Sequence, residues 1–275
     1  MSTTNDISHV YHGWLDAVST RDWDSASKLF ASEILHNEET ITSQTFLGRV
    51  RDEVAAMPDS RIETSIFVLD DPAEKIAAQL VHRGTLVKPH RGVADTGKQI
   101  QWSEYVFCGF RNGKLSAWMS LWDLDASKSQ STSNSTGRFT KRDSDVDLKN
   151  LYRQYIHSIN TLTMAEHFPD YCQPRITHNG INLSIDEYRS FIESSFEEIK
   201  GLKFTIAELV ADKESQRLAA RLEFSGCPVA EFRGIQPTGN EVTFSEHVLY
   251  ELDEGKIARV WSVLDLEAYR MSIQK

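Results

Sequence analysis

The chain has few cysteines, and its sequence has no segment typical of export or of membrane insertion. The three cysteines, Cys108, Cys172 and Cys227, are odd in number and lack C-x-x-C spacing, so we expect free thiols in a reducing compartment. The first residues are polar and lack the basic and apolar regions of a signal peptide. No apolar stretch approaches the roughly 18 residues of a membrane span. We therefore expect a cytoplasmic protein.

Positive charge is also scarce. The chain carries 30 Lys and Arg against 40 Asp and Glu, a net charge of −10. A chain that repels phosphate is a poor partner for nucleic acid or an anionic membrane, so we expect neither. G-x-S-x-G, Walker and G-x-G-x-x-G motifs are missing, and no histidine stands at a convincing metal-ligand spacing from a cysteine or carboxylate. We expect no cofactor and no metal.

What the sequence does contain is a long internal repeat. His36-Asn37 recurs as His178-Asn179, and the same offset of 142 residues aligns RGVADTGKQIQWSEYV from Arg91 with RGIQPTGNEVTFSEHV from Arg233. Missing a repeat of this kind would mis-assign the whole fold. We call the two repeats copy one and copy two. The repeat predicts domains at 1–125 and 147–275, joined by a Ser- and Thr-rich linker at 126–146.

Each copy shows a helical pattern before its strand patterns. Apolar residues at i, i+3, i+4 and i+7 predict helices that begin after Asp6 and Asp147, which suit N-caps, and Ser184 with Glu187 forms a capping box for a later helix. Alternating runs then predict strands, in copy one at Ile62–Leu69, Ile76–Val87, Ile100–Phe110 and Leu115–Leu124. Helices first and antiparallel strands afterwards indicate an α+β fold.

The segments R-G-I-Q-P-T-G-N-E-V-T-F-S-E-H and E-G-K-I-A-R-V-W-S-V-L-D in copy two, matched more loosely in copy one, resemble the SnoaL-like polyketide cyclases. The resemblance implies two tandem cone-shaped domains of the kind shared with nuclear transport factor 2 and ketosteroid isomerase. Each would be a curved, mostly antiparallel sheet wrapped by N-terminal helices around an apolar pocket. That superfamily includes aldol cyclases, isomerases, epoxide hydrolases and polyether-forming cyclases, and also binding proteins without enzymatic activity.

One carboxylate in each copy stands in an otherwise apolar row of a predicted strand, Glu104 in copy one and Glu246 in copy two. A buried lone carboxylate gains a partner or a raised pKa, and the second outcome suits a general acid. Anchoring a helix end or an arginine inside the cone is the structural alternative. In the SnoaL-like cyclases an Asp near the end of the last strand is the catalytic acid/base, and Asp123 and Asp265 match that position; closing the strand or capping the next turn is their alternative role.

The remaining candidates are histidines and bulky side chains. His36 and His178 lie on the first strand, where a neutral histidine relays protons or is a satisfied core residue. The side chains expected to bind an apolar substrate are Asn179, Tyr152, Tyr155, Phe244, Trp261, Trp14, Trp102 and Trp118. Trp102, Trp118 and Trp122 are large enough to fill the pocket of copy one. Copy two has smaller residues at those positions, so we expect its pocket to be the open one.

These features favour a cofactor-free acid/base enzyme that opens an epoxide, by hydrolysis or cyclisation, in a polyketide- or terpenoid-like intermediate. Opening an epoxide needs one group that protonates the oxygen and another that deprotonates the nucleophile, roles open to Glu246 and Asp265. The tandem layout is similar to that of two-domain polyether epoxide hydrolase/cyclases. The alternatives are an aldol cyclase or isomerase and a non-catalytic binding or scaffold protein. Members of the family commonly dimerise through their sheets, so we expect an intrachain pseudo-dimer and a monomer in solution.

Overall fold

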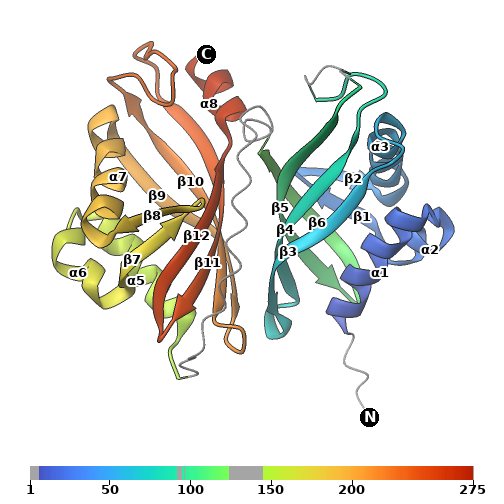
Figure 1. Cartoon of the computed structure of the whole chain (residues 1–275), viewed down its shortest axis with the longest axis horizontal. Helices are drawn as coiled ribbons and strands as arrows, with labels where there is room; N and C mark the ends of the chain where they lie inside the picture. Colours follow the sequence, from blue (N-terminus) through green and yellow to red (C-terminus); the bar gives the residue numbers. More distant parts are fainter. Residues whose placement is uncertain (1–5, 92–94, 96, 124–144, 275) are drawn as a thin grey trace. The chain divides into compact units, whose positions relative to one another are not determined.

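The computed structural model describes residues 6–91, 95, 97–123 and 145–274, and the chain divides into two compact units, residues 1–131 and 132–275. Each unit contains helices and one six-stranded sheet, which confirms the α+β class and the tandem arrangement (Figure 1). The predicted linker at 126–146 lies outside the described residues except for its last two positions.

The elements of copy one follow the predicted order, with one short strand that the sequence pattern did not show. They are α1 (Ile7–Thr20), α2 (Trp23–Lys28), β1 (Phe30–His36), β2 (Glu39–Thr42), α3 (Ser43–Ala56), β3 (Arg61–Asp70), a short 3-10 turn (Asp71–Ala73), β4 (Lys75–Thr85), β5 (Gln99–Arg111) and β6 (Lys114–Asp123). The unpredicted strand is β2, whose four residues are too few for an alternating pattern to stand out.

Copy two has the same order of helices and strands, and its described residues continue into a C-terminal helix. Its elements are α5 (Leu148–Asn160), α6 (Met164–Tyr171), β7 (Cys172–His178), β8 (Ile181–Ser184), α7 (Ile185–Glu198), β9 (Ile199–Asp212), β10 (Arg217–Pro228), β11 (Val242–Asp253), β12 (Lys256–Leu264) and α8 (Leu266–Ile273). The predicted caps are confirmed: Asp6 and Asp147 accept from the backbone N–H of His9 and Asn150, and Ser184 and Glu187 form the capping box.

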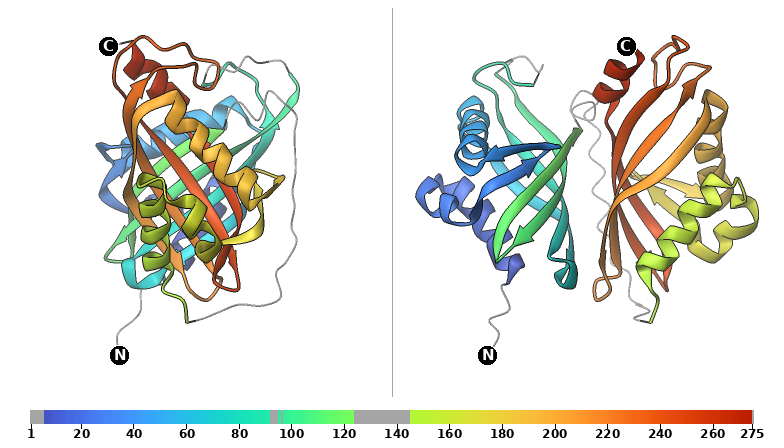
Figure 2. Two further views of the ribbon diagram at one scale, coloured as in Figure 1. Left: turned by 90° about the vertical axis from the view of Figure 1, so that its left-hand side faces the viewer. Right: turned by 180° about the vertical axis from the view of Figure 1, so that it is seen from behind.

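Both sheets have the same strand order, β2-β1-β6-β5-β4-β3 and β8-β7-β12-β11-β10-β9. All neighbouring strands are antiparallel except β1 with β6 and β7 with β12, which are parallel. Neither sheet closes on itself, as expected of a cone. In each unit the helices cover one face of the sheet (Figures 1 and 2), and the hydrophobic core lies between them.

The pairing of the strands determines which side chains point into that core. In copy one Glu104 pairs with Leu80 on β4 and with Trp122 on β6, and all three share the helix-covered face, because directly paired residues lie on one side of a sheet. In copy two Glu246 pairs with Leu222 and Leu264 in the same way. The sequence repeat is therefore also a repeat of register, and it places one glutamate inside each cone.

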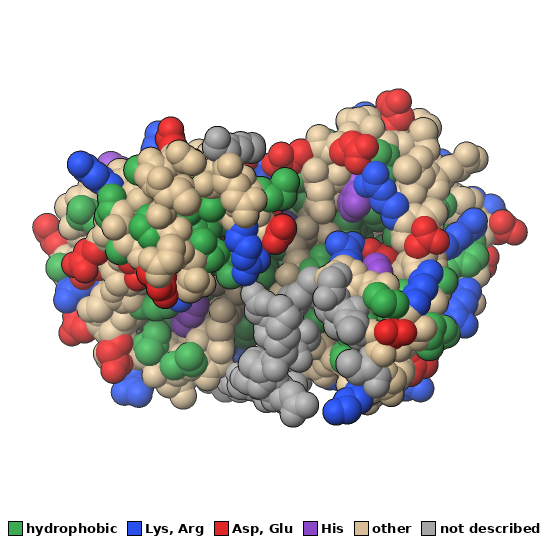
Figure 3. All heavy atoms as spheres, turned by 90° about the horizontal axis from the view of Figure 1, so that it is seen from above, with side chains coloured by type: hydrophobic (Ala, Val, Ile, Leu, Met, Phe, Trp, Pro, Cys, Tyr) green, Lys and Arg blue, Asp and Glu red, His purple; other side chains and the backbone are tan. Residues whose placement is uncertain are grey.

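Acidic and basic side chains are interspersed over the face drawn in Figure 3, and hydrophobic side chains occur there in small groups. Among the described residues, none of the helices has both the length and the apolar character needed to cross a membrane.

Candidate functional site

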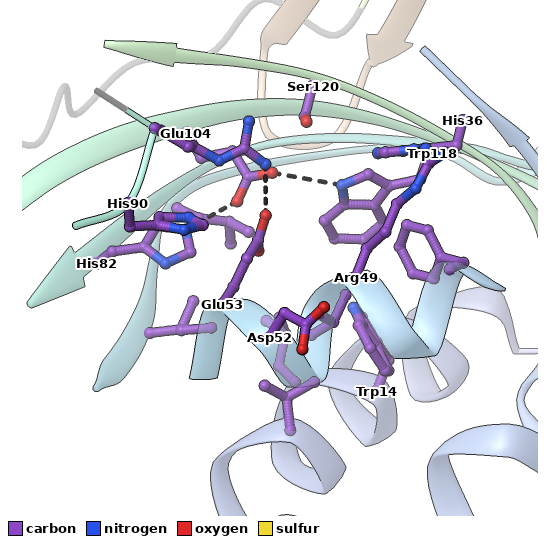
Figure 4. Close-up of a pocket in the computed structure, with 17 residues that line it drawn as sticks. Trp14, His36, Arg49, Asp52, Glu53, His82, His90, Glu104, Trp118 and Ser120 are labelled. Atoms are coloured by element: carbon purple, nitrogen blue, oxygen red, sulfur yellow. Dashed lines mark hydrogen bonds and ion pairs between the residues drawn. The ribbon is translucent and has the colours of Figure 1, made fainter. Parts of the chain in front are cut away.

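A cavity of about 280 Å³ lies inside copy one between the sheet and helices α1 and α3 (Figure 4). Its wall is mostly apolar, with contributions from Trp14 on α1 and Trp118 on β6. Eight ionisable side chains also line it: His36, Arg49, Asp52, Glu53, His82, His90, Arg91 and Glu104. An apolar cavity with a few convergent polar groups is the usual form of a small-molecule site.

Glu104 and His82 form a buried pair in this cavity. His82 Nε2 lies 2.8 Å from Glu104 Oε2, and Trp118 Nε1 donates to Glu104 Oε1 at 3.4 Å. Both side chains of the pair are more than nine-tenths buried. Burial raises the pKa of Glu104, but the hydrogen bond and charge of His82, the charge of Arg91 and a hydrogen bond to Ser120 together hold that pKa below its usual range. Glu104 is therefore a carboxylate, suited to accept a proton.

The tryptophans of copy one do not fill the cavity, which corrects the expectation that they would. Trp102 and Trp122 pack beside His82 with near-parallel rings, at centroid distances of 5.3 Å and 5.1 Å. Trp102 belongs to a small cluster with Met57 and Leu86 at one end of the sheet. Only Trp118 of the three lines the cavity. The pair of tryptophans fixes the imidazole of His82 and leaves the space in front of Glu104 open.

A second carboxyl, Glu53 on α3, points from the helix toward Glu104 (Figure 4). Burial raises its pKa, although Arg91 forms an ion pair with it. The Arg91 guanidinium also lies over the Trp122 ring, 4.0 Å from the centroid. Two carboxyls in one cavity thus have pKa values shifted in opposite directions, an arrangement that separates an acid from a base.

His36 is held in one tautomer at the side of the cavity. Arg49 Nη1 lies 2.9 Å from His36 Nδ1, and Arg49 Nη2 donates to Glu39 at 2.9 Å. Since a guanidinium can only donate, Nδ1 accepts and Nε2 carries the proton. Burial and the charge of Arg49 lower the pKa of His36, so the ring is a neutral donor.

Copy two keeps the glutamate but changes its surroundings. At the offset of the repeat, His82 is replaced by Phe224, Trp118 by Val260 and Glu53 by Ser195. Burial raises the pKa of Glu246 to about 7, opposed only in part by a hydrogen bond to Ser262 and by the charge of Arg233. His178 Nε2 lies 3.4 Å from Ser262 Oγ, and burial lowers the pKa of His178 to about 4.

The structure does not bring Asp123 or Asp265 together with these glutamates. Asp123 pairs with Ser103, and the backbone N–H of Asp265 donates to the carbonyl of Ser245 at 2.8 Å, so both aspartates follow the opposite side of the strands. Asp265 caps α8, where its Oδ1 accepts from the N–H of Ala268 at 2.9 Å. Trp261 pairs with Leu249 and likewise lies on the face away from the core.

The remaining residues predicted to bind substrate have structural partners in copy two. The Asn179 side chain accepts from the backbone of Ser262 at 2.9 Å and donates to its carbonyl at 3.1 Å, which ties β7 to β12. Tyr152 bonds Tyr250 at 3.2 Å, and Tyr155 bonds Tyr188 at 2.9 Å, all four buried. Phe244 is a core residue beside Phe224.

Sequence reasoning missed His82, Glu53, Arg49 and Arg91. The first two had a signal, because His82 continues the alternation of Ile76, Ala78 and Leu80, and Glu53 follows Phe46 and Val50 at helical spacing. Each is an ionisable residue on a face otherwise assigned to the core. Within the described ranges, no group of three or more His, Cys, Asp or Glu is arranged to hold a metal ion.

The model of the SnoaL-like polyketide cyclase family matches the chain twice, over residues 8–131 and 149–271. A solved SnoaL-like polyketide cyclase from Agrobacterium tumefaciens is 35% identical over 45% of this chain and 95% of its own, with a TM-score of 0.43. TsrD from Streptomyces laurentii is 20% identical over 49% of this chain and 97% of its own, with a TM-score of 0.42. No curated protein matches the chain.

Proposed function

Because the chain belongs to the SnoaL-like polyketide cyclase family, we propose that copy one is an acid/base site that opens an epoxide in a polyketide- or terpenoid-like substrate. Membership of the family supports a cyclase- or isomerase-type role. Epoxide opening is the finer proposal. The observation that carries it is the opposed pKa shifts of Glu104 and Glu53 in one cavity.

In this proposal Glu104 is the general base. Its carboxylate takes the proton from a water or from a hydroxyl of the substrate, whose oxygen then attacks one epoxide carbon. His82 is hydrogen-bonded to Glu104 at 2.8 Å and favours the ionised form of the carboxyl that the step requires. The Trp102 and Trp122 rings hold His82 in that position. Tryptophan packing therefore positions the base rather than the substrate.

Glu53 is the general acid. Its raised pKa makes it a better proton donor near neutral pH than an ordinary carboxyl, and the proton goes to the epoxide oxygen as the carbon–oxygen bond breaks. The Arg91 ion pair stabilises the carboxylate left behind. One proton enters the substrate at the epoxide oxygen and one leaves from the nucleophile, so the step is balanced. Solvent at the cavity mouth then returns the proton from Glu104 to Glu53.

The chemistry is thus proposed for copy one, whereas the sequence alone favoured Glu246 and Asp265 in copy two. Those two carboxyls follow opposite faces of the strands, while Glu53 and Glu104 line one cavity. The Nε2–H of His36 supplies a neutral donor for a substrate oxygen. Trp14, Trp118 and the aliphatic residues of the wall suit an apolar substrate.

The test is turnover of an aryl epoxide such as styrene oxide, and of a hydroxy-epoxide that can cyclise. Glu104→Gln and Glu53→Gln are each expected to lower kcat/KM by about 10²–10⁴-fold, the usual size of general acid/base help. Glu63→Gln, on the exposed part of β3, is the matched control and should change it less than about threefold. Full activity in folded Glu104→Gln would exclude this site.

Aldol cyclisation or isomerisation would use the same base but needs an oxyanion donor rather than a carboxyl acid. The neutral donor His36 is the observation that favours this second candidate. Deuterium exchange at an enolisable ketone separates the two, because it needs Glu104 but not Glu53. Exchange without epoxide opening would assign copy one to the isomerase type.

A further inference from the structure

The repeated His-Asn pair ends in an asparagine with a left-handed backbone, Asn37 in copy one and Asn179 in copy two, with φ of 46° in each. Asparagine tolerates this conformation better than most residues. The backbone N–H of Asn37 donates to the carbonyl of Trp118 at 3.3 Å, and its Oδ1 accepts from the N–H of Ser120 at 2.7 Å. Asn37 therefore extends the pairing of β1 with β6 beyond the end of β1, and it holds β6 at both ends of the stretch 118–120.

That stretch of β6 carries two of the donors to Glu104. Trp118 Nε1 donates to Glu104 Oε1 at 3.4 Å. The hydroxyl of Ser120 points into the same cavity and hydrogen-bonds the carboxyl as well (Figure 4). His82 reaches the other oxygen, Oε2, from β4 at 2.8 Å. A carboxylate has about four lone-pair positions, so three donors leave one for a proton.

We propose that Asn37 is a positioning residue for Glu104, which acts by fixing the stretch of β6 from which Trp118 and Ser120 donate. Asn37 is not one of the residues that line the cavity, so its effect passes through these two side chains. They occupy one side of the carboxylate and leave its free lone pair to the cavity. The inference deepens the proposed function and rests on it, because Glu104 is the general base there.

Copy two provides a matched control for the backbone contacts. The N–H of Asn179 donates to the carbonyl of Val260 at 2.9 Å, and its Oδ1 accepts from the N–H of Ser262 at 2.9 Å. The two asparagines therefore hold equivalent strands in the same way. An asparagine that serves the fold alone would have the same effect in both copies, whereas only Asn37 holds the donors of Glu104.

The readout is the indole N–H of Trp118, because it donates to Glu104 and so reports whether that carboxyl is ionised. The chain has six tryptophans, so isotope-labelled tryptophan gives six indole signals in a nuclear magnetic resonance spectrum of the full chain. Trp118→Phe identifies the signal, and Glu104→Gln should abolish its titration with pH. Other ionisable groups interact with Glu104 and are unchanged in the test variants: His82, Arg91, Glu53, His36 and Tyr11.

Ser120→Ala removes a donor to the ionised carboxyl, so the midpoint of the Trp118 titration should rise by about one pH unit or more. Ser120→Thr keeps the hydroxyl and should stay within about 0.3 of a unit of the parent chain. Asn37→Ala should raise the midpoint by about half a unit or more, and Asn179→Ala should leave it within about 0.3 of a unit. The acidic limb of the kcat/KM–pH profile for styrene oxide should move with the midpoint.

An unmoved midpoint in folded Ser120→Ala would overturn the inference, and so would an equal rise in Asn37→Ala and Asn179→Ala. Circular dichroism checks that each variant is folded, and the serine variants carry the test if Asn37→Ala does not fold. The expected midpoints in a chain that leaves epoxides intact would support the positioning of Glu104 and contradict only the proposed function.

Discussion

His82 and Phe224 occupy the same position in two copies of one sheet, and the difference between them reverses the pKa shift of the neighbouring glutamate. His82 bonds Glu104 and holds its pKa below the usual range, whereas Glu246, beside Phe224, has a pKa raised to about 7. Burial opposes ionisation in both cones. The fold therefore supplies the desolvation in both copies, an arginine and a serine oppose it in both, and only copy one adds the hydrogen bond and charge of a histidine.

The first prediction follows from this difference. His82→Phe removes the hydrogen bond and charge that lower the pKa of Glu104, so burial should raise that pKa above the usual range. The acidic limb of the kcat/KM–pH profile should then move to higher pH by about one unit or more. His90→Phe is the control, since His90 lines the cavity without bonding Glu104. An unmoved limb would show that His82 does not set the titration of the base.

The second prediction concerns the stability of copy two. The pKa of Glu246 is about 7 in the folded chain, whereas an unfolded chain leaves it at the ordinary value of 4.5, so folding binds protons between those two values. Protonated Glu246 therefore stabilises the folded chain by roughly 3 kcal/mol relative to the ionised form. This contribution is complete below pH 4.5 and is lost as the pH rises through 7. His178, Ser262, Arg233 and the buried tyrosines surround this carboxyl.

Glu246→Gln has no charge to bury, so its urea midpoint should exceed that of the parent chain at pH 8 and not at pH 5. Comparing the two proteins at each pH cancels the contributions to stability of the other groups that titrate in this range. Glu241→Gln, which changes an exposed carboxyl just before the same strand, is a suitable control. Parallel pH profiles for the parent chain and Glu246→Gln would contradict the raised pKa.

Much of the fold could be predicted because repeat and periodicity are local signals. The offset of 142 residues fixed the number of domains, and alternation placed Glu104 and Glu246 on the inner face. Glycine-containing turns at 111–114 and 253–256 join paired strands, and Asn112, Gly113, Glu254 and Gly255 all have positive φ there.

The site was less predictable, because it depends on contacts between elements distant in sequence. Glu53 meets Arg91 across 38 positions and His82 meets Glu104 across 22. The periodic pattern of apolar residues within one helix or strand carries no information about such a pairing between two elements. The aspartates were misplaced for another reason: the resemblance suggested their role, while parity along β6 and β12 places them on the other face. Size alone also misjudged Trp102 and Trp122, which pack sideways against His82.

The third prediction concerns association. On the face of each sheet away from its helices, strand pairing aligns an apolar row, Ala77, Phe107 and Met119 in copy one and Ala219, Leu249 and Trp261 in copy two. Faces of this kind favour contact with another apolar surface. Two equivalent faces in one chain lead us to expect that they satisfy each other. Light scattering should give the 31.3 kDa of one chain, and twice that mass would contradict the expectation.

The last prediction compares two equivalent glycines, Gly84 on β4 and Gly226 on β10. A Cβ at Gly84 would lie 2.6 Å from Cγ of Met57, and one at Gly226 would lie 2.6 Å from Cγ2 of Ile199 and 3.1 Å from backbone atoms of Leu202. Met57 has an unbranched side chain that can move, whereas Ile199 is branched and the backbone of β9 is held in the sheet. Gly226→Ala should therefore lower the free energy of unfolding by about 1–3 kcal/mol, the usual cost of overpacking, and Gly84→Ala should lower it by less.

Urea unfolding of both variants measures the difference. Gly48→Ala is the control, because a Cβ at Gly48 meets nothing within 4 Å. A larger loss in Gly84→Ala than in Gly226→Ala would mean that the side chain of Met57 is as fixed as the backbone of β9.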